Sequence, residues 1–463
     1  MSLELSDLKK WFNTHKQEIF SRFFTFLKFG SVGTDPAYRQ ETRKCAQWIV
    51  DYLKQIGFQS TLYETSVHPI VYGEYMHAGK EQPTLLIYHH YDVQPVDPLD
   101  LWKSGPFEPT IKEGQVYARG AQDNKGQCFY TLTALHAFLQ LCKEAKINLK
   151  LFIEGEEESG SVGTTQFLKE KGELLKADYL LVIDSGIPGP GVPAITMGLR
   201  GIVTMEVTLT NSAEDLHSGS HGGVVLNPNR ALVQLLAKLW DKEGKVAVPH
   251  FYDNVKKYSE TELAKFEMSF DKKDYEKKFG VKAYAIEPGF SPSESNYIRP
   301  VLEINGMSGG YAGKGFKTVI PSMAVAKISC RLVPYQDPEK IFHSIANFLR
   351  AEAPKGIDLK VEEYHGAAAF GSSFDSPIVK MVSKAYEEVL GKPCRYMLMG
   401  GSIPIVGELS KVSGAAVVVM GYGLDDDKIH APNEHFGLDR FEQGFLTVAR
   451  ILNHFQHAKT AKK

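Results

Sequence analysis

Cysteine is scarce in this chain of 463 residues and forms no recognisable pattern. The five cysteines are widely spaced and include no Cys-x-x-Cys pair: Cys45, Cys128, Cys142, Cys330 and Cys394. An odd number of scattered cysteines argues against a disulfide framework and against a zinc site built from thiolates. We therefore expect a protein of a reducing compartment, the cytoplasm.

An excess of charge and long apolar runs are missing as well. The formal net charge is −2 at pH 7, so we expect neither nucleic acid nor a membrane as a partner. The first 30 residues carry charges throughout and contain no apolar run long enough for export or for crossing a membrane. Their apolar residues recur at helical spacing, which predicts an amphipathic helix that packs on the rest of the protein.

Strand and helix patterns divide the chain into two kinds of segment. In the first and last parts, apolar runs typical of strands in a buried parallel sheet alternate with helical patterns. The runs that predict these strands are residues 84–88, 149–154, 179–183 and 415–420. The middle part, from about Gly198, instead has strands that alternate apolar and polar residues, as in a sheet with one exposed face.

These patterns predict an α/β fold with an open, mostly parallel sheet flanked by helices. We expect residues 1–198 and 374–463 to form this domain, and residues 199–373 to form an inserted α+β domain. A chain of 463 residues is long enough for two cores.

Three consecutive carboxylates, Glu156, Glu157 and Glu158, follow the predicted strand 149–154. Adjacent carboxylates at the end of a buried strand repel one another unless a positive charge lies among them. A pair of divalent metal ions would supply that charge, with one glutamate as ligand and a neighbour as general base. On this stretch alone, a solvated acidic loop that leads into a helix is the alternative.

Other polar side chains also follow predicted strands. His90, Asp123 and Asp184 come at three such ends, and His430 follows the strand at 415–420. Because strand ends of one parallel sheet converge, we expect these side chains to meet. Imidazoles mixed with carboxylates suit zinc, manganese or cobalt in a hydrolytic site. The excess of carboxylates favours two ions that share a bridging aspartate.

Three motifs resemble those of the di-zinc metallopeptidase family that includes carnosine dipeptidases, carboxypeptidase G and the aminoacylases. They are His90-Tyr91-Asp92, residues 119–126 and residues 154–161. The resemblance extends over essentially the whole chain, and the cytosolic non-specific dipeptidase branch is the most similar. It implies a zinc-exopeptidase-like catalytic domain and an inserted lid or dimerisation domain. The family more usually has an apolar residue at the position of Glu156.

The resemblance also implies two divalent metal ions per chain, zinc above all, with manganese or cobalt as alternatives. Asp123 would bridge the two ions. His90 and Asp184 would complete the ligands of one ion, and Glu158 and His430 those of the other.

The remaining motif carboxylates take supporting and catalytic roles by the same resemblance. Asp92 would hydrogen-bond the far nitrogen of His90 and fix its tautomer. Glu157 would be the general base that takes a proton from the attacking water and passes it to the leaving amine.

Four residues outside the metal motifs resemble substrate-binding residues of the family. His217 would reach across a homodimer interface and polarise the oxyanion in the partner's site. Arg331 would bind the substrate's terminal carboxylate, and Thr318 and Ser402 would make further contacts. An ordinary strand arginine and a flexible turn without chemistry are the alternatives for Arg331 and His217.

We therefore predict a cytoplasmic, homodimeric hydrolase that cleaves the amide bond of dipeptides or short peptides with a metal-bound hydroxide. An N-acyl amino-acid deacylase or desuccinylase would use the same site on a different acyl group. A non-catalytic relative is the rival from another class, and the intact Glu157 argues against it.

Overall fold

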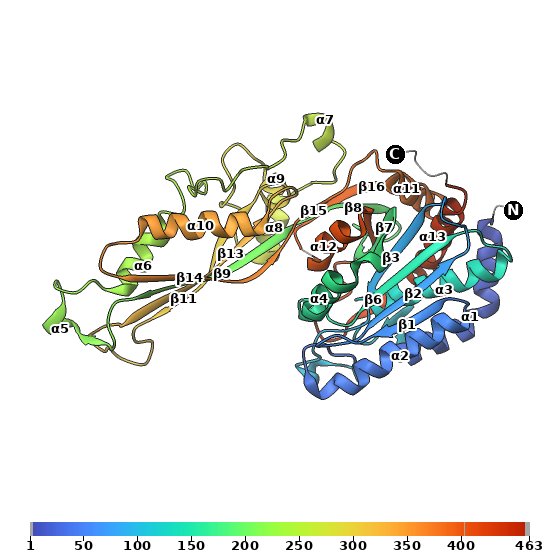
Figure 1. Cartoon of the computed structure of the whole chain (residues 1–463), viewed down its shortest axis with the longest axis horizontal. Helices are drawn as coiled ribbons and strands as arrows, with labels where there is room; N and C mark the ends of the chain where they lie inside the picture. The colour runs from blue at the N-terminus through green and yellow to red at the C-terminus, as the bar shows by residue number, and fades with distance from the viewer. Residues whose placement is uncertain (1–2, 402, 459–463) are drawn as a thin grey trace. The chain divides into compact units, whose positions relative to one another are not determined.

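The computed structural model of the protein describes residues 3–401 and 403–458. The chain divides into two compact units. The first unit comprises Met1–Met197, Ser372–Met397 and Ile403–Lys463, and the second comprises Gly198–Gly371 and Leu398–Ser402. Each unit has its own sheet and its own helices (Figure 1).

A nine-stranded sheet has the order β1-β2-β6-β3-β7-β17-β8-β15, with β16 paired to β8, and its parallel strands form the centre of the first unit. Its middle strands run parallel: β6 (Asn148–Glu154), β3 (Thr84–His90), β7 (Tyr179–Gly186) and β17 (Ala416–Gly423). Antiparallel strands flank them: β1 (Gln59–Tyr63), β2 (Ile70–Met76), β8 (Ala194–Leu199) and β15 (Phe370–Gly371). The remaining strand, β16, is Arg395–Met399. β3 and β7 are apolar along most of their length because helices cover both of their faces.

Two helical layers cover this sheet (Figure 1). The larger layer contains α1 (Leu5–Leu27), α2 (Arg39–Gln55), α3 (Lys125–Leu141), α11 (Pro377–Leu390) and α13 (Leu438–Phe455). Aromatic rings join these helices, with Phe129 of α3 close to Phe23, Trp48 and Phe441. The smaller layer contains α4 (Val162–Lys171) and α12 (Pro404–Ser413), which pack on each other. The predicted N-terminal packing helix is α1, whose apolar face is buried.

A small three-stranded sheet stands apart from the main one. It consists of β18 (His435–Gly437), β5 (Gln115–Tyr117) and β4 (Thr110–Lys112). The expectation that Asp123 follows a strand of the main sheet is therefore wrong. β5 pairs with β18 instead, and Asp123 lies in an irregular segment just before α3.

The second unit is built on a four-stranded antiparallel sheet in the order β11-β13-β9-β14. Its strands are β11 (Val301–Gly309), β13 (Met323–Leu332), β9 (Gly201–Thr210) and β14 (Asp358–Ala367). Alternate residues of β9 are buried, as expected for a sheet covered on one face. Two helices, α6 (Pro228–Ala237) and α10 (Pro338–Glu352), provide that cover and share a core with the sheet.

Shorter elements complete the second unit. A two-stranded ribbon pairs β10 (Leu216–His217) with β12 (Val319–Ile320). The short helices are α5 (Ser218–His221), α7 (Glu260–Leu263), α8 (Lys272–Phe279) and α9 (Pro292–Tyr297). The charged region 241–282 is thus helical only in part, as its sequence predicts.

Candidate metal centre

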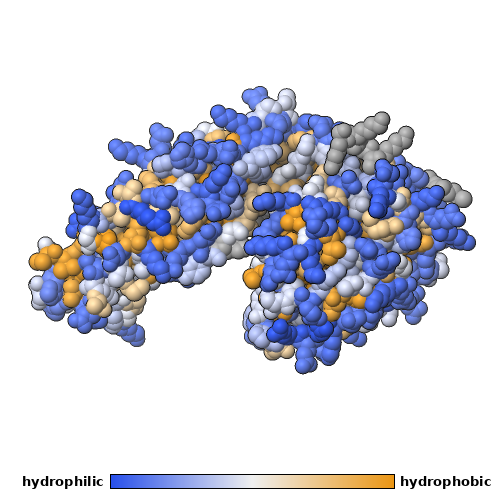
Figure 2. Space-filling model, in the orientation of Figure 1, coloured by the Kyte–Doolittle hydropathy of each residue, from blue (hydrophilic) through white to orange (hydrophobic). Residues whose placement is uncertain are grey.

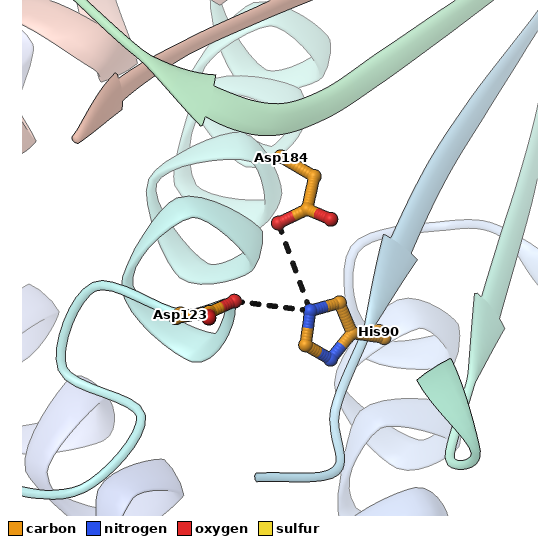
Figure 3. Close-up of side chains that lie close together, drawn as sticks. All are labelled: His90, Asp123 and Asp184. Carbon is orange, nitrogen blue, oxygen red and sulfur yellow. Dashed lines mark hydrogen bonds and ion pairs between the residues drawn. The ribbon is translucent and has the colours of Figure 1, made fainter. Parts of the chain in front are cut away.

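Two groups of ligand-type side chains meet in the first unit. One consists of His90, Asp123 and Asp184, and the other of Asp123, Glu158 and His430. Within each group the ligand atoms all lie within 4.8 Å of one another. Figure 3 shows the imidazole of His90 directed at the carboxylates of Asp123 and Asp184. Asp123 belongs to both groups, so the structure brings all five predicted ligands together around one shared carboxylate.

Different elements carry these five residues to the same edge. His90 ends β3, and Asp184 lies near the carboxyl end of β7. Glu158 is in a short 3-10 turn (Glu157–Ser159) that follows β6, and His430 is in the loop after β17. The convergence of parallel strands places these four residues, whereas Asp123 arrives from the segment before α3.

The distances between ligand atoms fit divalent cations. His90 Nε2 lies 3.2 Å from Asp123 Oδ1 and 3.6 Å from Asp184 Oδ1. His430 Nε2 lies 3.0 Å from Asp123 Oδ2 and 3.1 Å from Glu158 Oε1. Two ligands that bind one zinc ion at about 2.1 Å in tetrahedral geometry are about 3.4 Å apart. The donor set, imidazole nitrogens and carboxylate oxygens, is also the one that zinc, manganese and cobalt accept in proteins.

In the absence of a cation, the surroundings raise the affinity of Glu158 and His90 for protons. Burial and the neighbouring Asp123 carboxylate raise the pKa of Glu158 above its ordinary value. Burial alone would lower the pKa of His90, but Asp184 and then Asp123 raise it well above its usual range. Metal binding releases protons from groups of this kind, because ligands must be deprotonated to coordinate. The electrostatics therefore agree with the distances in favouring a cation site.

Asp92 connects His90 to the glutamate turn. Its buried carboxylate oxygen Oδ1 lies 3.3 Å from Nδ1 of His90. The same carboxylate accepts hydrogen bonds from the backbone N–H groups of Glu157 at 3.2 Å and Glu158 at 3.0 Å. The Asp92 carboxylate thus orients the imidazole of His90, as the resemblance predicts. It also orients the glutamate turn, which the sequence does not predict.

Glu157 belongs to neither ligand group among the described residues. Burial raises the pKa of its carboxyl well above the usual range; the His90 charge opposes this, while Asp184 and Glu158 add to it. A carboxylate with a raised affinity for a proton, beside but outside the ligand set, is suited to general-base chemistry.

Glu156, the remaining carboxylate of the run, has a structural role. It is buried, and it accepts hydrogen bonds from Thr65 Oγ1 at 2.8 Å, from the His68 N–H at 3.1 Å and from the Gly163 N–H at 2.6 Å. Glu156 therefore ties the loop at Thr65 to the start of α4. These three donors satisfy the buried carboxylate, which explains how Glu156 is tolerated at a position where the resemblance leads us to expect an apolar residue.

The motif at residues 119–126 contains structural residues beside Asp123. Asn124 donates a hydrogen bond from Nδ2 to Asp184 Oδ1 at 2.7 Å, and its Oδ1 lies 2.8 Å from His89 Nδ1. Lys125 instead points to the end of α1, where its Nζ donates to the Phe29 carbonyl at 2.6 Å. A Cβ on Gly126 would clash with the carbonyl oxygen of Ala121, so only glycine fits there.

A second buried carboxylate, Glu434, binds the backbone of residues 119–126, and the sequence did not predict this role. Glu434 accepts hydrogen bonds from the backbone N–H groups of Gln122 and Asp123, both at 3.0 Å. The only sequence signal for this role is that Glu434 stands four positions after His430.

The predicted substrate-binding residues belong to the second unit. His217 pairs with Val319 in the ribbon, and Thr318 directly precedes Val319; the Ser218 N–H donates to the Thr318 carbonyl at 3.0 Å. Arg331 lies in β13 of the four-stranded sheet, opposite Ile202 of β9. Ser402 lies outside the described residues.

Comparison with known proteins identifies the family. Residues 86–454 match the model of peptidase family M20/M25/M40. The chain belongs to this family. The predicted metallopeptidase resemblance, the α/β fold class and the hydrolysis of peptide bonds are therefore confirmed.

Alignments with similar proteins extend over almost the whole length of this M20 peptidase. The Cys-Gly metallodipeptidase of Schizosaccharomyces pombe is 28% identical, with 96% of this chain and 97% of the relative aligned. The Beta-Ala-His dipeptidase of Rattus norvegicus is also 28% identical, with 95% and 93% aligned. The crystal structure of an M20 family metallo-carboxypeptidase from Sulfolobus solfataricus superposes with a TM-score of 0.83 at 31% identity, covering 95% of this chain and 100% of that one.

Across residues 3–401 and 403–458 of this M20 peptidase, no helix combines the length and the apolar character needed to cross a membrane.

Proposed function

We propose that this M20 peptidase is a dipeptidase or short-peptide carboxypeptidase that works with two divalent metal ions, zinc in the first place. The observation that carries the proposal is the position of Asp123, whose two carboxylate oxygens lie 3.2 Å from His90 and 3.0 Å from His430. The names of the relatives, two dipeptidases and a carboxypeptidase, support the substrate class.

The proposed mechanism assigns the metal ligands to His90, Asp184, Asp123, Glu158 and His430. Two bound divalent cations would supply Lewis acidity toward the scissile carbonyl and the attacking water. Glu157 accepts the proton of that water and delivers it to the leaving amine. Asp92 contacts both the imidazole of His90 and the backbone N–H of Glu157, so it holds the ligand and the general base in a fixed relative position.

The second unit would provide substrate recognition. In this proposal Arg331 binds the terminal carboxylate of the substrate with its planar guanidinium, and Thr318 and Ser402 make further polar contacts. His217 of the partner subunit donates a hydrogen bond to the oxygen that becomes negative in the transition state.

A homodimer would also cover apolar surface. Apolar residues are exposed on the second unit near α5 and the outer strands, as Figure 2 shows. They include Val224, Met307, Phe316 and Met323. Cytoplasmic localisation is supported by the cysteines, since the five are free.

The test combines metal analysis with a substrate panel. Metal content is measured by mass spectrometry, and hydrolysis of dipeptides, N-acylated amino acids and C-terminally amidated dipeptides is followed with and without a chelator. We expect activity on dipeptides with free termini that is lost to the chelator and restored by zinc or manganese. Activity on N-acylated amino acids alone would identify a deacylase. No hydrolysis of any substrate after metal addition would refute the proposed function.

A further inference from the structure

Glu434 is a fully buried carboxylate that is not one of the metal ligands. Four donors converge on it. Oε1 accepts from the N–H groups of Gln122 and Asp123, and Oε2 accepts from the Gly120 N–H at 2.9 Å and from Arg119 Nη1 at 2.9 Å. Removing a carboxylate of this kind would leave buried donors without an acceptor, which destabilises the segment that carries them.

These hydrogen bonds fix the segment that carries Asp123. The Asp123 N–H is itself one of the donors, and Arg119 is held in turn by Nη2, which donates to the Pro95 carbonyl at 2.9 Å, and by the Trp102 ring, 5.3 Å away. Residues 118–124 belong to no helix or strand. The orientation of Asp123 between His90 and His430 therefore depends on side-chain contacts rather than on regular structure.

Glu434 also stabilises the loop that carries His430. The two residues are four positions apart, and the Ala118 N–H donates to the Glu434 carbonyl at 3.1 Å. The backbone of this loop is strained, because Lys428, His430 and Asn433 all have positive φ angles. A strained loop keeps its shape only when its surroundings hold it, and Glu434 attaches it to the Asp123 segment.

We propose that Glu434 is a positioning residue that couples the two halves of the metal centre, so that both ions depend on it. The inference rests on the two-ion site of the proposed function and extends it to a residue to which neither the motifs nor the ligand groups assign a role. Asp92 joins His90 to the glutamate turn, and Glu434 joins Asp123 to the His430 loop. Because Asp123 serves both ligand groups, a shift of its segment disturbs both ions at once.

The decisive variant is Glu434→Gln, which keeps the shape but replaces an acceptor oxygen with an N–H donor. Asp427→Asn is the matched control. Asp427 is buried in the same loop, pairs with Arg440 at 2.5 Å and 2.6 Å, and accepts from the Leu424 N–H at 2.7 Å. These hydrogen bonds hold Leu424 and Arg440 rather than the Asp123 segment, so the control removes a buried carboxylate without releasing Asp123.

The measurement is calorimetric titration of chelator-stripped full-length protein with Zn²⁺, and separately with Mn²⁺, together with the melting temperature of stripped and loaded protein. We expect Glu434→Gln to weaken both binding steps by about 10–100-fold, as for other residues that orient metal ligands, and to reduce the rise in melting temperature on loading. Asp427→Asn should lower the melting temperature of the stripped protein but change at most one binding step.

Two results would overturn the inference. If Glu434→Gln bound both ions with wild-type affinity and only melted earlier, Glu434 would be structural, and if only one step weakened, the coupling would be absent. Should this variant fail to fold, Glu434→Asp keeps the charge and is expected to weaken both steps by less, whereas wild-type affinities would refute the role. A wild-type protein that binds both ions but hydrolyses no peptide would refute the proposed substrate class and leave the coupling intact.

Discussion

The metal-ligand region of the first unit and the ribbon of the second unit differ in how their backbones are held. Around the metal ligands, the buried carboxylates of Asp92 and Glu434 accept hydrogen bonds from the backbone of Glu157, Glu158 and Asp123. In the ribbon, His217 and Thr318 are exposed, and each of the two paired strands is only two residues long. Buried carboxylates therefore fix the backbone around the candidate metal ligands, whereas only two short paired strands hold the backbone beside the proposed recognition residues His217 and Thr318.

The largest effect that separates the two regions is expected from Glu157→Gln. Removing a general base costs about 10²–10⁴-fold in rate, and the metal content should stay at the wild-type level because Glu157 is outside both ligand groups. Steady-state kinetics and metal analysis of the same preparation measure both quantities. Loss of metal along with activity would place Glu157 among the ligands.

His217→Ala should lower kcat by about 10²–10³-fold, the usual cost of losing an oxyanion donor. The free energy of unfolding of the His217→Ala variant should differ from that of the wild type by less than about 0.5 kcal/mol, because the side chain is exposed. Mixed dimers of His217→Ala with Glu157→Gln should regain part of the activity, since one composite site would then have both groups intact. Mixtures as inactive as the parents would contradict donation across the dimer.

Arg331→Met should raise KM for dipeptides with a free carboxylate while kcat changes less. A hydrogen bond to a charged group contributes about 1.5–3 kcal/mol, or about 10–100-fold in affinity. C-terminally amidated dipeptides serve as the control, because they lack the charge that Arg331 would bind. An equal loss on both kinds of substrate would assign Arg331 a structural role.

The prediction with no expected effect on activity at neutral pH concerns the pH dependence of stability. Burial lowers the pKa of His89 to about 3, although the Asn124 hydrogen bond opposes this, whereas an unfolded histidine titrates near about 6.5. Between these values the unfolded state binds the extra proton, so stability falls as the pH falls below about 6.5, by up to about 1.4 kcal/mol per pH unit. Urea unfolding of chelator-stripped wild type and His89→Gln from pH 7 to pH 4 measures the difference. Parallel pH profiles would contradict a neutral, buried His89.

Much of the fold and of the candidate site follows from local patterns. The apolar runs predict the parallel strands β3, β6, β7 and β17, and polar residues at or just beyond the ends of strands predict where His90 and Asp184 meet. The same strand-end argument includes Asp123 for a wrong reason, because no strand of the main sheet leads to it, and its bridging position is predicted by the family resemblance alone.

What the sequence could not predict depends on contacts between distant segments. Glu434 meets Asp123 across 311 positions of the chain, and its partners are backbone N–H groups, which every residue except proline possesses. Glu156 and Glu157 look alike in the sequence, and only the fold gives one to the Thr65 loop and leaves the other beside the ligands. Asn124, which links Asp184 to His89, is hidden for the same reason.

The carboxylate of Asp123, which belongs to both ligand groups, is the centre of the proposed two-ion site. The direct test is metal content per chain, measured by mass spectrometry for wild type and Asp123→Asn after equilibration with Zn²⁺ and removal of unbound metal. We predict close to two ions per chain in the wild type and loss of both in the variant, because each ligand group contains Asp123. A wild type that holds a single ion, or a variant that loses only one, would contradict a centre built around a bridging aspartate.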